Sequence, residues 1–264
     1  LRPPLRPSAQ DLEFYWDILQ PWIQEHRASR VLLLGVTPEL YHLPWPEGTD
    51  FQAVDRSREM IEAVWPGPKS SVVCTDWLSV NPADGCRDII LCDGGLHLID
   101  YPWGQSKLIR VLHGMLSEDG LCVFRLYVLP TRPESPEMVL QDLLDGNIGT
   151  PEALKIRLGM SLLARPEEGV EADQIYRTLI HAFPEFERLA AGIGWSAEQT
   201  QSILDYKDSK QKFYWLSADR AIALFCSYPG GFRVHRIKTP SYELGARCPT
   251  IAFQRLSAPK IDPA

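Results

Sequence analysis

The sequence predicts an α/β fold: a doubly wound, mostly parallel seven-stranded sheet with an antiparallel C-terminal hairpin and a helical insertion. Short apolar runs recur through residues 31–128, and several of them end in a Gly or an Asp. Segments with helical spacing separate these runs, and this alternation is typical of a parallel sheet covered by helices on both faces. From residue 129 to 215 the pattern is helical with no convincing strand, which indicates an inserted cap.

The two strands predicted at 31–35 and 51–54 organise the chain. The first apolar run ends at Gly35, and the second ends 20 residues later at Asp55. A glycine at a strand end lets the backbone approach a ligand, because it has no Cβ. The carboxyl ends of adjacent parallel strands form the usual ligand crevice of an open α/β sheet. We therefore expect a nucleoside-containing ligand here, with Asp55 accepting hydrogen bonds from ribose hydroxyls.

Before these strands, residues 1–29 are predicted to form an N-terminal helical cover. Ser8 can cap a helix that continues to about residue 26, with Asp11 at the capping-box position. Pro21 is expected to kink this helix or to divide it in two, because proline lacks the backbone N–H that the helix needs.

The other elements of the core follow in chain order. Further strands are expected at 71–74, 88–92 and 121–128, and the last two, at 232–237 and 250–254, suit an antiparallel hairpin. Helices are expected at about 36–43, 58–65, 104–116 and 218–227. The core is therefore predicted to comprise residues 30–128 and 216–264, with right-handed crossovers between its parallel strands.

Residues 129–215 are predicted to form the helical insertion or cap. Its helical segments are expected at about 137–144, 152–164, 171–191 and 197–209. Pro184 should kink or divide the third of these segments. An all-helical stretch of this length between sheet strands is typical of a lid over a binding site.

Composition and charge exclude several classes of protein. The formal net charge is −7 and no long Lys/Arg run is present, so we predict no nucleic-acid partner. No apolar stretch reaches the roughly 18 to 20 residues of a transmembrane helix, and the first ten residues lack the apolar core of a secretory signal. The six cysteines form no CxxC pair, and no histidine has ligand spacing with cysteines or acids. We predict a cytoplasmic protein with reduced thiols, no membrane partner and no metal site.

Three acids follow successive predicted strands, namely Asp55, Asp76 and Asp93. Beside a first strand that ends in glycine, this pattern resembles the class I S-adenosylmethionine-dependent methyltransferases. The matching segments are VLLLGVTPEL, AVDRSREMI, CTDWL and DIILCDGGLHLI. The resemblance covers about 31–128 and 217–256, and it implies the Rossmann-like methyltransferase fold, whose sheet also ends in an antiparallel hairpin.

The resemblance implies S-adenosylmethionine as the cofactor, with S-adenosylhomocysteine as its product. Gly35 would pass the methionine part, Asp55 would bind both ribose hydroxyls, and Met60 would lie against the adenine. Asp76 would accept from the adenine amino group, and Asp93 would line the donor end near the methyl group. The cofactor site implied in this way consists of Gly35, Val36, Thr37, Asp55, Arg56, Met60, Asp76, Trp77, Asp93 and Gly94.

The chain departs from the family at its first motif. The family pattern is G-x-G-x-G, whereas Gly35 is followed here by Val-Thr-Pro-Glu. This disfavours a dinucleotide-binding domain, which needs the second glycine for the pyrophosphate. It also keeps open a second class of function: a non-catalytic protein that binds S-adenosylmethionine or a nucleoside, or a regulatory protein, with a methyltransferase fold. A third class is a protein or nucleic-acid methyltransferase. The acidic net charge argues against methylation of a base amino group, and so does Asp93, which opens DGGL instead of an Asn/Asp-Pro-Pro-Tyr/Phe motif.

The predicted function is transfer of a methyl group to a small-molecule acceptor by in-line displacement, in a monomer or a homodimer. Such a reaction needs alignment of the nucleophile and, where it carries a proton, a base. His97 is the candidate base because its unperturbed pKa, near 6.5, suits proton abstraction at neutral pH. The alternative is that His97 is a polar residue at a helix start. Tyr101 is the second catalytic candidate, as a lining residue of the acceptor pocket.

Other side chains are candidates for acceptor contacts. Arg125 and Tyr127 are polar residues within the fifth predicted strand, and such residues need partners in a sheet that is covered on both faces. We expect one of the two to reach the active cleft. In the insertion the candidates are Arg157, Tyr176, Arg177, Tyr206 and Lys207.

Overall fold

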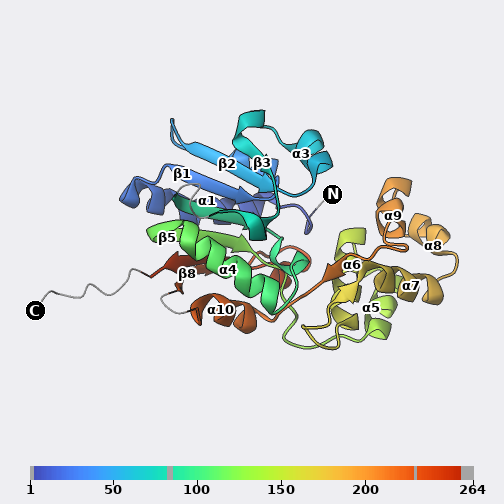
Figure 1. Cartoon of the computed structure of the whole chain (residues 1–264). Helices are drawn as coiled ribbons and strands as arrows, with labels where there is room; N and C mark the ends of the chain where they lie inside the picture. The colour runs from blue at the N-terminus through green and yellow to red at the C-terminus, as the bar shows by residue number, and fades with distance from the viewer. Residues whose placement is uncertain (1–2, 82–85, 229–230, 257–264) are drawn as a thin grey trace, which may run out of the picture.

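A computed structural model describes residues 3–81, 86–228 and 231–256, and it shows a seven-stranded mixed sheet between helices (Figure 1). The strand order is β3-β2-β1-β4-β5-β9-β8. The strands are β1 (Arg30–Leu34), β2 (Asp50–Asp55), β3 (Val72–Cys74), β4 (Arg87–Asp93), β5 (Leu116–Arg125), β8 (Phe232–Lys238) and β9 (Thr250–Arg255). The first five pair in parallel, whereas β9 is antiparallel to both β5 and β8. The predicted fold class is confirmed; the ends of the predicted terminal ranges, residues 1–2 and 257–264, lie outside the described residues.

The helices agree with the expected segments within a few residues, except where prolines and caps adjust them. They are α1 (Ala9–His26), α2 (Pro38–Tyr41), α3 (Arg58–Val64), α4 (Trp103–Met115), α5 (Pro136–Leu144), α6 (Pro151–Leu162), α7 (Ala172–Ala182), α8 (Phe186–Gly192), α9 (Ala197–Leu204) and α10 (Ala218–Cys226). The capping box of Ser8 and Asp11 is present at the start of α1. Along the part of the chain that the structure describes, no helix has the length and apolarity to cross a membrane.

Proline acts differently in two helical segments. Pro184 separates α7 from α8, as predicted. Pro21, in contrast, lies inside α1 without dividing it, so of the two expected outcomes the division is wrong and the kink stays a prediction. Helix α1 continues because Ile18, Leu19 and Trp22, which flank the proline, are buried against the sheet. This burial outweighs the loss of one helical hydrogen bond.

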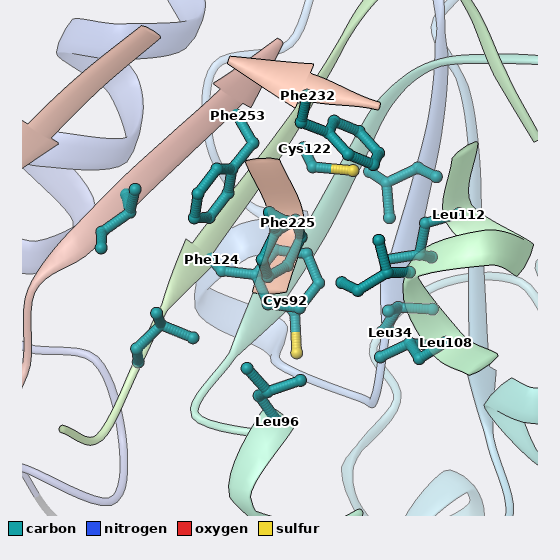
Figure 2. Packing of buried hydrophobic residues seen from close by; sticks show 14 of the residues in the cluster. Leu34, Cys92, Leu96, Leu108, Leu112, Cys122, Phe124, Phe225, Phe232 and Phe253 are labelled. Atoms are coloured by element: carbon teal, nitrogen blue, oxygen red, sulfur yellow. The ribbon is translucent and has the colours of Figure 1, made fainter. Parts of the chain in front are cut away.

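Both faces of the sheet are buried, which explains the unbroken apolar run at residues 31–34. Leu32 and Leu34 belong to the apolar cluster beneath α4 and α10, whereas Val31 and Leu33 belong to the cluster beneath α1. Successive side chains of a strand point to opposite faces, so a strand covered on both faces is apolar at every position. Figure 2 shows the first cluster, in which phenylalanines from β5, α10, β8 and β9 pack together.

Helices α5 to α9 lie together at one side of the sheet (Figure 1). They form an apolar cluster of their own, separate from the two clusters on the sheet. The expectation of no strand between residues 129 and 215 is wrong, because β6 (Val170–Glu171) pairs antiparallel with β7 (Lys212–Phe213). Two-residue strands carry no periodicity that a sequence pattern reveals, and the paired residues, Val170 with Phe213 and Glu171 with Lys212, lie far apart in the sequence.

Strand β5 differs from its prediction at both ends. It begins at Leu116 and ends at Arg125, whereas residues 121–128 were expected. Asp119 lies inside the strand, where the register with β4 shifts, and it has a φ of 59°. Beyond Arg125 the strand assignment ends, although the N–H of Val128 still donates to the Arg247 carbonyl of the loop before β9.

Candidate functional site

The predicted cofactor residues gather at the carboxyl edge of the parallel strands. In the sheet register Leu34 pairs with both Val54 and Cys92, and Asp55 pairs with Cys74. The ends of four neighbouring strands therefore meet at one edge. The residues at or just beyond these ends are Gly35, Asp55, Asp76 and Asp93.

The turn after β1 contains a single glycine. Gly35 has a φ of 93°, in the region that favours glycine, and its N–H donates to the Val54 carbonyl at 2.7 Å. The same carbonyl accepts from Trp77 Nε1 at 2.8 Å. A Cβ added to Gly35 would lie 3.6 Å from the Trp77 ring, so the indole packs directly behind the turn. Thr37 then precedes α2, which begins at Pro38.

Two of the acids are held by backbone groups two residues further along. Asp55 Oδ1 accepts from the Ser57 N–H at 2.8 Å, and Asp76 Oδ1 accepts from the Leu78 N–H at 2.7 Å. Such turns fix the direction of a carboxylate. Within the described residues, no group donates to Asp55 Oδ2, so this oxygen is available to a ligand hydroxyl.

Two adjoining pockets open at this edge, with volumes of about 270 Å³ and 260 Å³. They share Asp55, Trp77 and Leu98 in their linings. The first pocket is also lined by Gly35, Val36, Thr37, Met60, Asp93 and Gly94, and the second by Arg56 and Asp76. Each of the ten predicted cofactor-binding residues thus lines at least one pocket, and their role as ligands stays a prediction.

The Asp93 carboxylate forms a buried ion pair with Arg125. Arg125 Nε donates to Asp93 Oδ1 at 2.5 Å and Nη2 donates to Oδ2 at 3.1 Å, and both side chains are at most 3% exposed. Burial raises the pKa of Asp93, and the Arg125 charge acts against this. Arg125 Nη1 donates to the Pro4 carbonyl at 2.7 Å. The carboxylate at the expected donor end is therefore already engaged within the protein.

Gly94 and Tyr127 form the next part of the first pocket. Gly94 has a φ of 67°, and a Cβ there would lie 2.7 Å from the Tyr127 ring. Tyr127 lines the pocket, and its hydroxyl donates to the Pro4 carbonyl at 2.6 Å. The expectation that Arg125 or Tyr127 reaches the cleft is confirmed for Tyr127.

His97 lines the first pocket, but its surroundings do not suit a base. Its ring stacks against Phe213 and Trp215, with centroids at 5.6 Å and 5.8 Å, and lies edge-on to Tyr127. Burial lowers the pKa of His97 to about 3. This pKa departs from the unperturbed value near 6.5 on which the choice of His97 as a base depended, because the aromatic surroundings disfavour the charged imidazolium. His97 Nδ1 is buried, and no group of the described residues forms a hydrogen bond with it.

Tyr101 lines neither of the two pockets. It lies in the segment that leads into α4 and packs against the apolar cluster of that face. The geometry therefore does not bring Tyr101 to the site where an acceptor was expected.

The insertion contributes mainly residues that the sequence did not single out. Of its five predicted contributors, Tyr206 lines the first pocket and the other four do not. Arg157 instead forms ion pairs with Glu134 and Asp142. The residues missed are Leu5 and Arg6 from the N-terminal segment and Lys155, Ile156, Phe213 and Trp215 from the insertion. One signal for Lys155 was present: apolar residues occur on all sides of α6, which indicates a helix that is buried all round.

Comparison with known proteins supports the fold assignment. No family model matches the chain, and no curated protein sequence does. Among solved structures, a candidate S-adenosylmethionine-dependent methyltransferase from Listeria monocytogenes aligns with a TM-score of 0.50 and 13% identity, over 92% of this chain and 98% of that one.

Two further structures align with lower scores. The N-methyltransferase NodS from Bradyrhizobium japonicum, solved with S-adenosylhomocysteine, gives a TM-score of 0.47 and 12% identity over 95% of this chain and 90% of that one. The mitomycin 7-O-methyltransferase MmcR gives a TM-score of 0.47 and 12% identity. That alignment covers 94% of this chain and 58% of MmcR.

The strand order and the alignment with the Listeria protein define the class of fold. The chain has the fold of the class I S-adenosylmethionine-dependent methyltransferases, with the antiparallel pair β9-β8 at one edge of the sheet. At 13% identity the likeness establishes the fold, and the activity has to be argued from the site.

We expect Arg125→Met to lower the free energy of unfolding by about 3–5 kcal/mol, because it leaves the Asp93 carboxylate buried without its partner. The double variant with Asp93→Asn should recover part of this loss. Arg165→Met is a matched control, since Arg165 pairs with Glu168 at the exposed surface, and its cost should stay within about 1 kcal/mol. Urea unfolding at pH 7.5 measures all three variants; equal costs for both single variants would contradict the assigned role of the buried pair.

We also expect His97 to make stability depend on pH. Its pKa of about 3 in the folded chain lies below its ordinary value near 6.5, so its contribution is present above pH 6.5 and is lost as the pH falls towards 3. Between pH 7.5 and 5.0 the wild type should lose about 2 kcal/mol more unfolding free energy than His97→Phe. Urea unfolding at both pH values tests this, and an identical loss in the two proteins would contradict the burial of a neutral His97.

Proposed function

We propose that this protein is an S-adenosylmethionine-dependent methyltransferase that transfers a methyl group to a small-molecule acceptor. One observation carries the proposal. The two adjoining pockets lie at the carboxyl edge of a methyltransferase-type sheet, and the ten residues matched to the family's cofactor motifs line them. The pockets meet at Asp55 and Trp77, between the ends of β1 and β2 and the segment after β3.

The side chains at this edge fit the cofactor. Asp55 has one carboxylate oxygen held by Ser57 and the other available to a ribose hydroxyl. The backbone at Gly35 has no Cβ and lies beside Asp55, and Asp76 borders the second pocket, where the adenine amino group would donate to it. When bound, S-adenosylmethionine supplies an electrophilic methyl group on a sulfonium.

The protein's part in the reaction is to position the acceptor and exclude water. Asp93 is committed to Arg125, and His97, with a pKa of about 3, holds a proton poorly at neutral pH. Neither is suited to remove a proton from the acceptor. The reaction therefore relies on in-line alignment, which by itself contributes several kcal/mol to catalysis. An acceptor atom that is already deprotonated when it binds suits this site.

We propose that the acceptor binds between the core and the cap. The division into a cover (1–29), a core (30–128 and 216–264) and a cap (129–215) accords with the separate apolar cluster of helices α5–α9. The first pocket takes lining residues from all three parts, including Leu5 and Arg6 from the cover. The cytoplasmic location and the monomeric or homodimeric state stay predictions.

A second candidate is a non-catalytic or regulatory protein that binds S-adenosylmethionine or a nucleoside. The observation that favours it is the lone glycine of the first turn, with the Trp77 indole packed behind it. A protein that only binds such a ligand would need the two pockets and the carboxylates of Asp55 and Asp76. It would not need a binding site for a methyl acceptor.

We expect calorimetric titration with S-adenosylmethionine and S-adenosylhomocysteine to show binding that Asp55→Ala weakens at least tenfold. The reason is that a hydrogen bond to a charged group contributes about 1.5–3 kcal/mol. Glu62→Ala, a change at an exposed position on α3, is the control and should bind like the wild type. Unchanged affinity in Asp55→Ala would remove Asp55 from the site. If neither ligand binds to folded wild type, the methyltransferase proposal fails.

A further inference from the structure

Lys155 is a buried cation with little to neutralise it. It lies in α6, where every residue from Pro151 to Met160 is buried, and it is itself 5% exposed. Its ammonium lies within hydrogen-bond distance of Ser202 Oγ, at 3.2 Å, and of the Ser202 carbonyl, at 3.4 Å. Among the residues that the structure describes, no carboxylate lies within 4.0 Å of it. Buried charges are normally paired, so this ammonium has capacity left for a ligand.

The contrast with Arg157, two residues further along the same helix, is informative. Arg157 is also buried, and it makes ion pairs with both Glu134 and Asp142. The fold thus supplies full partners to one cation of α6 and not to the other. Arg157 does not line the first pocket, whereas Lys155 does. The cation without a carboxylate partner is the one that borders the cavity.

The walls beside Lys155 are aromatic. Its Nζ lies 5.4 Å from the centre of the Tyr206 ring, which also lines the pocket. Phe213 and Trp215 line it as well, with ring centres 5.3 Å apart, and His97 stacks on both. Aromatic side chains arranged in this way can pack against the planar ring of a ligand. Two polar atoms of these walls, His97 Nδ1 and Trp215 Nε1, are buried and have no hydrogen-bond partner among the residues that the structure describes.

Two carboxylates act on Lys155 from beyond ion-pair distance. Burial lowers the pKa of Lys155, and the charges of Glu152 and Asp205 oppose this. Both acids line a different pocket, on the side of α9, and not the pocket that holds Gly35 and Asp55. They help to keep the ammonium charged. Ser202, which accepts from the ammonium, lines that other pocket with them, whereas Tyr206, which also lies beside the ammonium, lines the first pocket.

We propose that the methyl acceptor is an aromatic carboxylic acid, whose carboxylate binds Lys155 and whose ring lies against Phe213, Trp215 and Tyr206. This inference rests on the proposed methyltransferase function, and it names the substrate class of the same site. The carboxylate would supply the anionic partner that Lys155 lacks in the protein. The ring would extend from the cap towards Gly35 and Asp93, which line the same cavity.

The test uses a pair of probes of nearly the same shape, 4-hydroxybenzoate with a charged carboxylate and 4-hydroxybenzamide with a neutral amide, in the presence of saturating S-adenosylhomocysteine. We expect the wild type to bind the acid at least tenfold more tightly than the amide, measured by ligand-observed NMR titration. Lys155→Met keeps the aliphatic stem and should reduce this ratio to within twofold. Lys155→Arg retains a positive charge and should therefore prefer the acid, as the wild type does. Glu152→Gln is the control and should also prefer the acid.

The outcomes separate this inference from the proposed function. S-adenosylhomocysteine should bind to the wild type and to Lys155→Met with equal affinity, because Lys155 lies on the cap side. Equal binding of the two probes to the wild type, or a preference that survives in Lys155→Met, would overturn the inference while the cofactor site stands. Loss of S-adenosylhomocysteine binding in both proteins, each shown to be folded by circular dichroism, would instead overturn the proposed function and this inference with it.

Discussion

The buried ion pair of Arg125 and Asp93 is the interaction on which the site depends. It joins the ends of β4 and β5, and Arg125 also reaches the Pro4 carbonyl and lies 4.0 Å from Asp11. The Tyr15 hydroxyl completes the same corner, because it donates to the Cys92 carbonyl and accepts from the Arg125 N–H. An arginine without exposure to water needs all of these partners, since each unmatched donor would cost free energy. The N-terminal segment is therefore fixed over the strand ends, which places Leu5 and Arg6 on the pocket.

This constraint also limits the chemistry. A carboxylate at the end of β4 would otherwise be the natural group to take a proton from the acceptor, but here it neutralises Arg125. His97, a few residues further on, is held neutral by the rings around it. The charged groups of the site thus serve to hold segments and ligands in place. In the proposed methyl transfer, rate enhancement would come from alignment in a pocket that already has its shape, as transfer from a sulfonium permits.

The part of the site that follows from chain order was predictable, and the part that depends on packing between distant segments was not. Gly35 and Asp55 end adjacent parallel strands, so their proximity follows from the fold class alone. The pairing of Arg125 with Asp93 joins residues 32 positions apart, and no spacing rule reveals which of several acids an arginine will meet. Lys155 reaches the pocket only because α6 is central in the cap, and the short strands β6 and β7 carry no periodic signal. The low pKa of His97 likewise arises from rings more than 100 residues away in sequence.

The cap is tied to the core beside the pocket, and this bears on how the site recognises its acceptor. Gln105 of α4 is fully buried, and its Nε2 donates to the carbonyls of Leu96 and Ile99 and to that of Tyr214. The Tyr214 N–H donates in turn to the His97 carbonyl at 2.8 Å. Phe213 and Trp215 flank Tyr214, so the aromatic wall is anchored by main-chain hydrogen bonds to the segment after β4. A wall held in this way needs no large closing motion to meet a planar ligand. For the proposed methyltransferase, selection among acceptors would then rest on fit and charge at a preformed surface, which is the arrangement that limits the entropy lost on binding.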